Sequence, residues 1–465
     1  MKGKRLFVVS PYLHWIINKK GKCIIWHSLA GNPIVVSKSV LDFLLIFSTP
    51  KTLEDALARY TNQSRILELF YSLKKIRFIN FIEFDERLSL ERIIERRNLR
   101  GLDGSFIDYL ELRVSETCNF NCSYCILKNA ERINRTGYKK FMDFETAKKA
   151  IDIYISLLKR NGKKKAEITF GGAEPTLNWS LIEKCVEYME STYGDIIKLV
   201  FYINTNFSLF FGDRFDFIKK HKIKISPSID GYDAQSNDST RKTKSKHGTF
   251  NDIMEVVHRF NEIGVKIPDC STTTNEDNFK FVNYKLIDWA KKEHFEKIHI
   301  NIDVMNATKL DPVDVANRLI RLVHYAKRKK MFMSGFWRRP AENISYSLIN
   351  NRTGFCGATR GDNLAVDPLG DIYSCGYSDR IIGSVHNFIS FFEKDGPYHS
   401  FLREISPIAT EFCHGCEIEG YCGGGCLATR EFNKKNNNPE KVKQMCVLYK
   451  TMTRNLLKDQ IYERR

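Results

Sequence analysis

The sequence predicts an α/β protein whose central part is a partial or full barrel of about six strands. Residues 107–305 alternate between apolar, β-rich runs and amphipathic helical stretches, which is the order of parallel βαβ units. A small unit of strands and short helices precedes this region, and a segment rich in glycine and cysteine follows it. At 465 residues the chain is too long for one ordinary hydrophobic core, so several domains are expected.

The first 95 residues read as strands followed by helices, the order of a small winged-helix unit. Two β-rich runs, LFVVSPYLHWII and KCIIWHS, lie on either side of a turn at Asn18–Gly21. The stretch SKSVLDFLLIFSTP is amphipathic, begins at a serine cap and stops at Pro50. Two more helical patterns follow. Plain helix packing gives the same pattern, and composition does not separate the two.

In the central region, polar residues follow the apolar runs where the strands are expected to end. The tails are CNFNC, GGAEP, NTN and SIDG, and they follow four successive strand patterns. The patterns VKIPDCSTTTN and KIHINIDV supply further strands. Because ligands bind at the carboxyl ends of parallel strands, we expect the chemistry of the protein at these tails.

The formal net charge of +18 favours an anionic partner, either nucleic acid or an acidic peptide. The basic runs KRNGKKK, RKTKSK and AKRKK also fit solvated loops and helix ends. The N-terminus lacks the uninterrupted apolar region of a signal peptide, and no apolar run of about 18 residues occurs. We therefore expect a cytoplasmic protein without a membrane partner.

The 13 cysteines are clustered, which indicates metal binding in a reducing compartment and not disulfides. Three lie within residues 118–125 and seven within residues 356–446. Cys23, Cys185 and Cys270 stand alone, and we expect them to pack in the core as small apolar side chains.

Cys118, Cys122 and Cys125 form a C-x3-C-x2-C motif at the end of a predicted strand. A [4Fe–4S] cluster is usually held by four thiolates, so three thiolates leave one iron free to bind a ligand. A structural zinc site prefers four ligands, and no histidine lies nearby. The loop therefore predicts an open-site cluster.

With Tyr124 before its last cysteine, this motif resembles C-x3-C-x-aromatic-C of the radical S-adenosylmethionine (SAM) enzymes. The resemblance implies that SAM chelates the free iron and is cleaved to a 5′-deoxyadenosyl radical. It also implies that Gly171 and Gly172 let the backbone approach the methionine end of SAM. Glu174 would receive the SAM ammonium, although Ala173 departs from the family's Gly-Gly-Glu order.

Two further strand ends resemble the family's contacts near the SAM ribose and carboxylate. They are INTN, with Asn204, Thr205 and Asn206, and SIDG, with Ser228, Asp230 and Gly231. Arg241 is expected to pair with the SAM carboxylate. For each of these single polar residues, a role as a structural cap is the alternative. The expected SAM contacts are Tyr124, Gly171, Gly172, Glu174, Asn206, Ser228, Asp230 and Arg241.

The seven C-terminal cysteines resemble the SPASM domain of radical SAM peptide-modifying enzymes, with a zinc ribbon as the alternative. Their pattern is Cys356-x13-Gly370-x4-Cys375, Cys413-x2-Cys416-x5-Cys422-x3-Cys426 and Cys446. The resemblance implies two auxiliary [4Fe–4S] clusters. Cluster I would be held by Cys356, Cys375 and Cys426, and cluster II by Cys413, Cys416, Cys422 and Cys446. Cluster I lacks one ligand, which a substrate thiolate, Asp362 or water would supply.

The N-terminal unit resembles the RiPP recognition element, the PqqD-like winged helix fused to maturases of ribosomal peptides. That domain binds a leader peptide as an added strand, and an acidic leader suits the charge of +18. The resemblances together imply a maturase that abstracts a hydrogen atom from a precursor peptide and installs a thioether or carbon–carbon cross-link. An auxiliary cluster would take up the remaining electron, and flavodoxin or ferredoxin would be the electron donor.

The full prediction is a partial (β/α)6 TIM-type barrel with a PqqD-like winged helix before it and an iron–sulfur-stapled SPASM domain after it. The predicted boundaries are residues 1–95 for the winged helix, 96–309 for the barrel, 310–350 for a helical connector and 351–465 for the SPASM domain.

Three other functions are considered. An anaerobic sulfatase maturase, which makes formylglycine, would place an Asp directly after the cysteine matching Cys375, but this chain has Gly376. A tRNA-modifying enzyme would carry an RNA-binding module, and none is evident, so no nucleic-acid partner is expected. A zinc-stapled binding protein would contain zinc and no acid-labile sulfide, which metal analysis distinguishes.

Overall fold

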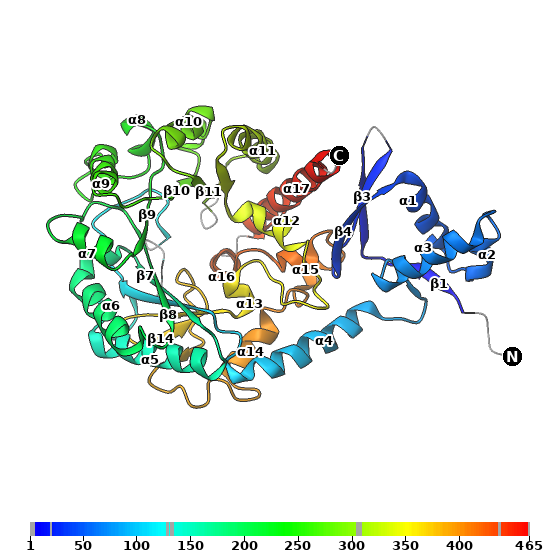
Figure 1. The fold of residues 1–465 in the computed structure, drawn as a ribbon, viewed down its shortest axis with the longest axis horizontal. Coiled ribbons are helices and arrows are strands. Elements are labelled where there is room, and N and C mark those ends of the chain that lie inside the picture. Colours follow the sequence, from blue (N-terminus) through cyan, green and yellow to red (C-terminus); the bar gives the residue numbers. More distant parts are fainter. Residues whose placement is uncertain are drawn as a thin grey trace.

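A computed structural model describes residues 5–18, 21–126, 130, 134–303, 309–435 and 439–463. The N-terminal unit lies to one side of the molecule, and the C-terminal segment lies between it and the central barrel-like region (Figure 1). The α/β class and the parallel sheet predicted from the sequence are confirmed. Among the helices that the structure describes, none is long and apolar enough to cross a lipid bilayer.

The N-terminal unit contains two small antiparallel sheets and three helices around its own apolar core. One sheet pairs β1 (Phe7–Val9) with β5 (Ile79–Phe81), and the other has the order β2-β3-β4. The core is built from buried side chains that include Phe47 and Phe70. The remaining elements are β2 (Leu13–Ile17), β3 (Lys22–His27), β4 (Gly31–Ser37), α1 (Lys38–Leu45), α2 (Leu53–Leu57) and α3 (Gln63–Lys75). Helix α4 (Glu86–Arg100) spans the boundary predicted at residue 95 and runs toward the rest of the molecule.

Parallel strands form the central region in chain order, with helices between them (Figure 1). Strands β6, β7, β8 and β9 are hydrogen-bonded neighbours, and a parallel bridge from Ser228 to Ser271 connects β9 to the β10-β11-β12 sheet. The strands are β6 (Tyr109–Ser115), β7 (Lys165–Gly172), β8 (Lys198–Thr205), β9 (Lys224–Pro227), β10 (Asp269–Thr274), β11 (Lys297–Ile302) and β12 (Phe332–Ser334). The helices are α5 (Phe144–Arg160), α6 (Trp179–Tyr193), α7 (Arg214–Lys220), α8 (Ala234–Asn237), α9 (Phe250–Glu262), α10 (Tyr284–Lys292) and α11 (Pro312–Arg328).

The strands of this region are apolar on the face that meets the helices and polar on the other face. In β11, for example, Ile298 and Ile300 are buried in the core, whereas His299 and Asn301 are half-buried. Parallel strands that are covered on both faces have sequences that are apolar throughout. The alternation seen here instead indicates that the inner face of the curved sheet lines a cavity.

The C-terminal segment continues the same sheet. Strand β13 (Asn363–Val366) pairs in parallel with β6, and β14 (Asp371–Tyr373) and β15 (Gly383–Ser384) extend the sheet beyond it. The helices of this segment are α12 (Arg339–Asn343), α13 (Gly357–Arg360), α14 (Pro397–Glu404), α15 (Glu419–Cys422), α16 (Leu427–Lys435) and α17 (Pro439–Glu463).

One strand lies where the sequence predicts a helical connector. Residues 310–350 contain α11, but β12 follows it and pairs in parallel with β11. Three residues are too short a run for a β period to stand out against flanking helical patterns.

The N-terminal unit is attached to the C-terminal segment through Trp26 of β3. Its side chain is 1% exposed and packs in a cluster with Ile344, Tyr421 and Leu457. The indole Nε1–H donates a hydrogen bond of 2.8 Å to the carbonyl oxygen of Glu417. The two regions therefore share a buried interface.

Replacing Trp26 by alanine is expected to lower the free energy of unfolding by about 3–5 kcal/mol, because it leaves a cavity in this interface. Chemical denaturation followed by circular dichroism measures the change. Trp15→Ala is the control, since Trp15 lies on the same sheet but is 41% exposed, and it should cost less than about 1 kcal/mol. Equal losses in the two variants would contradict the interface.

Candidate active site

The cysteine loop follows β6 and is held against a second loop by backbone hydrogen bonds. The Asn121 N–H donates to the Lys242 carbonyl oxygen at 2.7 Å, and the Ser123 N–H donates to the Thr240 carbonyl oxygen at 2.9 Å. Two separate backbone bonds to one neighbouring segment fix the path of the loop. All three thiols then face one cavity, lined by Cys118, Cys122 and Cys125.

The chemistry of these thiols suits iron–sulfur ligation. Burial above all, together with the nearby Glu174, Cys122 and Cys125, raises the pKa of Cys118 to about 12. Thiols in such surroundings stay protonated unless a cation binds them as thiolates. Three close thiols, of which Cys122 is buried and the other two are half-buried, therefore fit a metal cluster much better than three free side chains.

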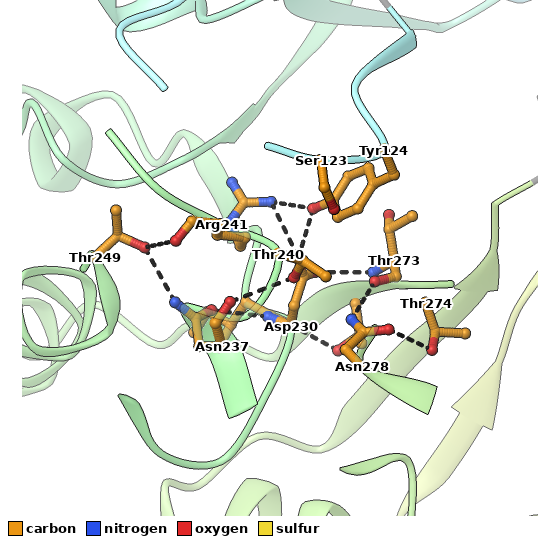
Figure 2. A network of polar contacts seen from close by, with 12 residues as sticks. Ser123, Tyr124, Asp230, Asn237, Thr240, Arg241, Thr249, Thr273, Thr274 and Asn278 are labelled. Carbon is orange, nitrogen blue, oxygen red and sulfur yellow. Dashed lines mark hydrogen bonds and ion pairs between the residues drawn. The ribbon is translucent and has the colours of Figure 1, made fainter. Parts of the chain in front are cut away.

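The loop is also tied to the barrel by a buried network of side chains (Figure 2). The Tyr124 hydroxyl donates to Asp230 Oδ2 at 2.6 Å and accepts a hydrogen bond of 2.6 Å from Arg241 Nη1. Asp230 Oδ2 also accepts from Thr240 Oγ1, and Oδ1 accepts from the Thr273 N–H. Burial raises the pKa of Asp230, while the charge of Arg241 opposes that shift. Tyr124 and Asp230 therefore position the cysteine loop.

Arg241 retains a free donor in this network. Its Nε–H is buried and has no hydrogen-bond partner among the described residues. The side chain also lines the cavity that the three thiols face. A buried, unpartnered donor of a cation fits a carboxylate at this position.

Glu174 joins the ends of β7 and β8. Its Oε1 accepts hydrogen bonds from the N–H and hydroxyl of Thr176 and, at 2.6 Å, from the Thr205 hydroxyl. Its Oε2 accepts from the Asn206 N–H at 2.8 Å. The carboxylate is 1% exposed but lies in the cavity wall. Since Oε2 accepts one hydrogen bond from the described residues, it keeps a lone pair for a ligand donor.

The glycines before Glu174 serve different purposes. Gly172 has a φ of 106°, and a Cβ there would collide with the Ser115 carbonyl oxygen. Any side chain would therefore separate β7 from the end of β6. Gly171 makes room for the side chain of Glu111, since a Cβ there would lie 2.6 Å from Glu111 Oε1.

Two other predicted contacts differ in their positions. Asn206 Nδ2 donates to Asn119 Oδ1 at 2.8 Å and so supports the cysteine loop. The Ser228 N–H donates to the Thr205 carbonyl oxygen at 3.0 Å. The predicted SAM contacts in the cavity wall are Tyr124, Gly172, Glu174, Asn206, Ser228 and Arg241. Gly171 and Asp230 lie behind that wall.

The C-terminal cysteines form two sets. The pKa of Cys375 is raised by burial and then by the neighbouring thiols of Cys426 and Cys356. The pKa of Cys422 is raised by burial and then by the thiols of a different set, Cys446, Cys413 and Cys416. The first set lines the cavity that the cysteine loop also faces, and the second set does not.

The thiol groups are not arranged around a single ion. Among the described residues, no three Cys, His, Asp or Glu side chains converge on a position that suits one metal ion. In a [4Fe–4S] cluster each thiolate binds a different iron, so the ligands surround a larger volume than the ligands of zinc do. A four-iron cluster therefore does not require the convergence on one point that a zinc ion requires.

Asp362 is already held by two arginines. Arg360 Nε donates to Asp362 Oδ2 at 2.6 Å, and Arg352 Nη2 lies 2.9 Å from Oδ1. Burial raises the pKa of Asp362, and both arginines oppose the shift. To become a cluster ligand, Asp362 would have to give up these ion pairs, which makes it a poor candidate for the missing ligand of cluster I.

The cavity itself has a volume of about 730 Å³ and is walled by residues from most of the chain. The barrel strands supply Glu111, Asn204 and Thr273, and the C-terminal segment supplies Gly376 and Tyr377. Sequence reasoning missed Glu111 and Tyr377. Alternation along β6 places Glu111 on the inner face, but Tyr377 carries no local signal beyond its place after Cys375.

Replacing Cys118, Cys122 and Cys125 together by alanine is expected to abolish SAM cleavage, because these three thiols are the expected ligands of the cluster to which SAM would bind. The iron that the C-terminal cysteines are expected to hold should persist. Release of 5′-deoxyadenosine after addition of dithionite, with iron and sulfide counts on the same sample, measures both effects. A matched variant with Cys185 and Cys270, which are buried in the core, replaced by alanine should retain cleavage. Cleavage by the triple variant would refute the assignment.

Comparison with known proteins agrees with this site. Residues 112–285 match the model of the Radical SAM superfamily. The chain is 25% identical to the radical SAM cyclopropyl synthase TigE of Paramaledivibacter caminithermalis, over 98% of this chain and 97% of the relative.

Solved structures share the fold. Native anSMEcpe with bound AdoMet and the Cp18Cys peptide covers 76% of this chain and 99% of its own, with 17% identity and a TM-score of 0.58. Streptococcus suis SuiB bound to S-adenosylmethionine covers 91% of this chain and 96% of its own, with 16% identity and a TM-score of 0.52. Together with the cysteine motif at the end of β6, the family match over residues 112–285 identifies this part of the chain as a radical SAM domain.

Proposed function

We propose that the enzyme modifies a ribosomally made precursor peptide by abstracting a hydrogen atom from it and forming a new bond within it. One observation carries the proposal. A single cavity of about 730 Å³ is lined both by the cysteine loop and by Cys356, Cys375 and Cys426. A substrate in this cavity would share it with the place where a radical forms and with the place where an electron can be accepted.

The first cluster and SAM would bind at the ends of β6, β7 and β8. Cys118, Cys122 and Cys125 would hold a [4Fe–4S] cluster, and the free Nε–H of Arg241 would bind the SAM carboxylate. The open lone pair of Glu174 Oε2 suits the SAM ammonium. Once bound, SAM and the cluster supply a 5′-deoxyadenosyl radical. The protein positions both and keeps the reacting atoms away from bulk water.

Two auxiliary [4Fe–4S] clusters would bind in the C-terminal segment. Cys356, Cys375 and Cys426 would hold the cluster that faces the cavity, and the second set of cysteines would hold the other. When bound, the cluster that Cys356, Cys375 and Cys426 would hold would supply an electron acceptor at the cavity. Flavodoxin or ferredoxin would deliver the electron that starts the reaction.

A carbon–carbon bond is the modification that the comparisons favour. The relative that matches nearly the whole chain is named a cyclopropyl synthase, and a cyclopropyl group is a ring of three carbon atoms. A thioether remains an alternative, because the ion-paired Asp362 leaves the fourth position of the cavity-facing cluster available to a substrate thiolate.

Formylglycine formation is the second candidate. Two of the anSMEcpe structures contain AdoMet together with a peptide, Cp18Cys or Kp18Cys. Gly376 stands against it, because it provides no carboxylate next to Cys375. An aldehyde-reactive hydrazide followed by mass spectrometry separates the two, since only formylglycine formation leaves an aldehyde at a Cys or Ser position.

The N-terminal unit would bind the leader of the precursor as an added strand. Strand β2 lies at the edge of its sheet, and among the described residues only β3 pairs with it. Trp15 and Ile17 on this strand are 41% and 45% exposed. An edge strand with exposed apolar side chains can bind an extended peptide through its backbone and through side-chain contacts.

The proposed function is tested with the full chain reconstituted under anaerobic conditions. About twelve irons and twelve sulfides per chain are expected from three four-iron clusters. With SAM, dithionite and the peptide encoded next to the gene, the product should be lighter by two hydrogen atoms for each bond formed. About four irons together with zinc would mean that the C-terminal cysteines bind zinc and have a structural role only. An unchanged peptide would refute the proposal.

Replacing Trp15 and Ile17 together by glutamate is expected to weaken binding of the precursor at least tenfold, because it removes apolar contacts and repels an acidic leader. Fluorescence anisotropy with labelled precursor measures the affinity. Uncoupled cleavage of SAM should be unchanged, since the site lies at the barrel. Ile196→Glu, at an exposed position after α6, is the control and should bind normally. Unaltered affinity in the double variant would rule out β2 as the docking edge.

A further inference from the structure

Glu111 places a carboxylate in the wall of the cavity that both sets of cysteines line. It lies in the middle of β6, on the polar inner face of the sheet, and it lines the cavity together with Cys125 and Cys375. Neither SAM nor any of the expected clusters has a role for it in the site described above.

Two glycines create the space that this carboxylate occupies. A Cβ at Gly171 of β7 would lie 2.6 Å from Glu111 Oε1. A Cβ at Gly376, next to Cys375, would lie 2.6 Å from Glu111 Cδ and Oε2. Neither glycine has a left-handed φ, so the backbone does not require glycine at either position. The need is for room around the carboxylate.

The carboxylate has few partners. Gly376 lies directly against it, and Arg113, whose charge acts on it, forms its ion pair of 2.5 Å with Glu116 instead. Among the described residues, no ion pair involves Glu111. Burial raises the pKa of Glu111, while Arg113 and the Gly376 N–H oppose the shift. A carboxylate with these surroundings is basic and has free lone pairs toward the cavity.

We propose that Glu111 is a catalytic residue that accepts the proton released when the new bond forms in the substrate. This inference rests on the proposed function, and it assigns the base of that reaction.

The proposal balances the atoms and electrons of the reaction. Joining two substrate atoms that each carry hydrogen removes two protons and two electrons. One hydrogen atom goes to the 5′-deoxyadenosyl radical and forms 5′-deoxyadenosine. The second proton goes to the Glu111 carboxylate. The second electron goes to the oxidised cluster that Cys356, Cys375 and Cys426 would hold, which becomes reduced.

The position of Gly376 brings the acceptor of the second proton close to the acceptor of the second electron. Gly376, which follows Cys375, packs directly against the carboxylate of Glu111, since a Cβ at Gly376 would lie 2.6 Å from Glu111 Oε2. The proton acceptor and the electron acceptor therefore meet at one point of the cavity wall. A substrate radical at this point can lose the second proton and the second electron without moving between two sites.

The test compares Glu111→Gln with the wild-type enzyme in the presence of a precursor peptide deuterated at the reacting residue. Glutamine has the same shape and cannot take the proton, so product formation should fall by about 10²-fold or more. Transfer of deuterium into 5′-deoxyadenosine should persist, because it precedes proton loss. Precursor affinity, measured by anisotropy, and the thermal unfolding midpoint should match the wild-type values. Glu187→Gln, which removes the same charge from the exposed face of α6, is the control.

A second pair of variants moves the carboxylate to the opposite side of the same space. Glu111→Ala should lose product formation, and adding Gly376→Asp should restore it at least tenfold, because an aspartate there points at the vacated position. Glu111→Ala combined with Gly376→Ala fills that space without an acid and should remain inactive.

The outcomes separate the two proposals. Wild-type-like product formation by Glu111→Gln would overturn the role of Glu111 and leave the proposed function intact. A loss of precursor affinity as large as the loss of product would overturn it as well, since Glu111 would then bind a cationic substrate group. If the wild-type enzyme itself leaves the precursor unmodified, the proposed function fails.

Discussion

The geometry of the site depends on the hydrogen bonds between Tyr124, Asp230 and Arg241. The cysteine loop has no regular structure of its own, so its shape is set by what it touches. Tyr124 carries the loop to Asp230, which follows β9, and Asp230 in turn accepts the N–H of Thr273 on β10. Two strand ends and the cysteine loop are thereby fixed relative to one another, and the cavity wall inherits that arrangement.

The inner face of the sheet can stay polar because the apolar packing of the barrel lies on its outer face. A barrel that fills its interior with apolar side chains gains stability from that core. Here the helices outside the sheet provide the apolar packing, and residues such as Asn204, Thr273 and Asn301 remain inside. The interior is then available for a substrate. Burying its polar groups costs little free energy, because these groups hydrogen-bond to each other or border the cavity.

Much of this arrangement follows from local sequence. The alternation of strands and helices, the polar strand ends and the three-cysteine motif are short-range patterns, and each predicted its element. The pairing of β13 with β6 and the burial of Trp26 against Tyr421 join residues far apart in the chain, so no local pattern reveals them. Glu111 shows most clearly what local sequence patterns do not predict, because its environment depends on Gly171 and Gly376 from two other segments.

The pairing of β13 with β6 also has a consequence for how the chain folds. Tyr109 in the first barrel strand lies opposite Asn363, so the edge of β6 is covered only after most of the chain has been synthesised. Contacts of such high sequence separation form slowly. Until then β6 presents an unpaired edge that other chains can bind, and partly made molecules are prone to aggregate. We therefore expect the wall of the cavity to be completed late in folding.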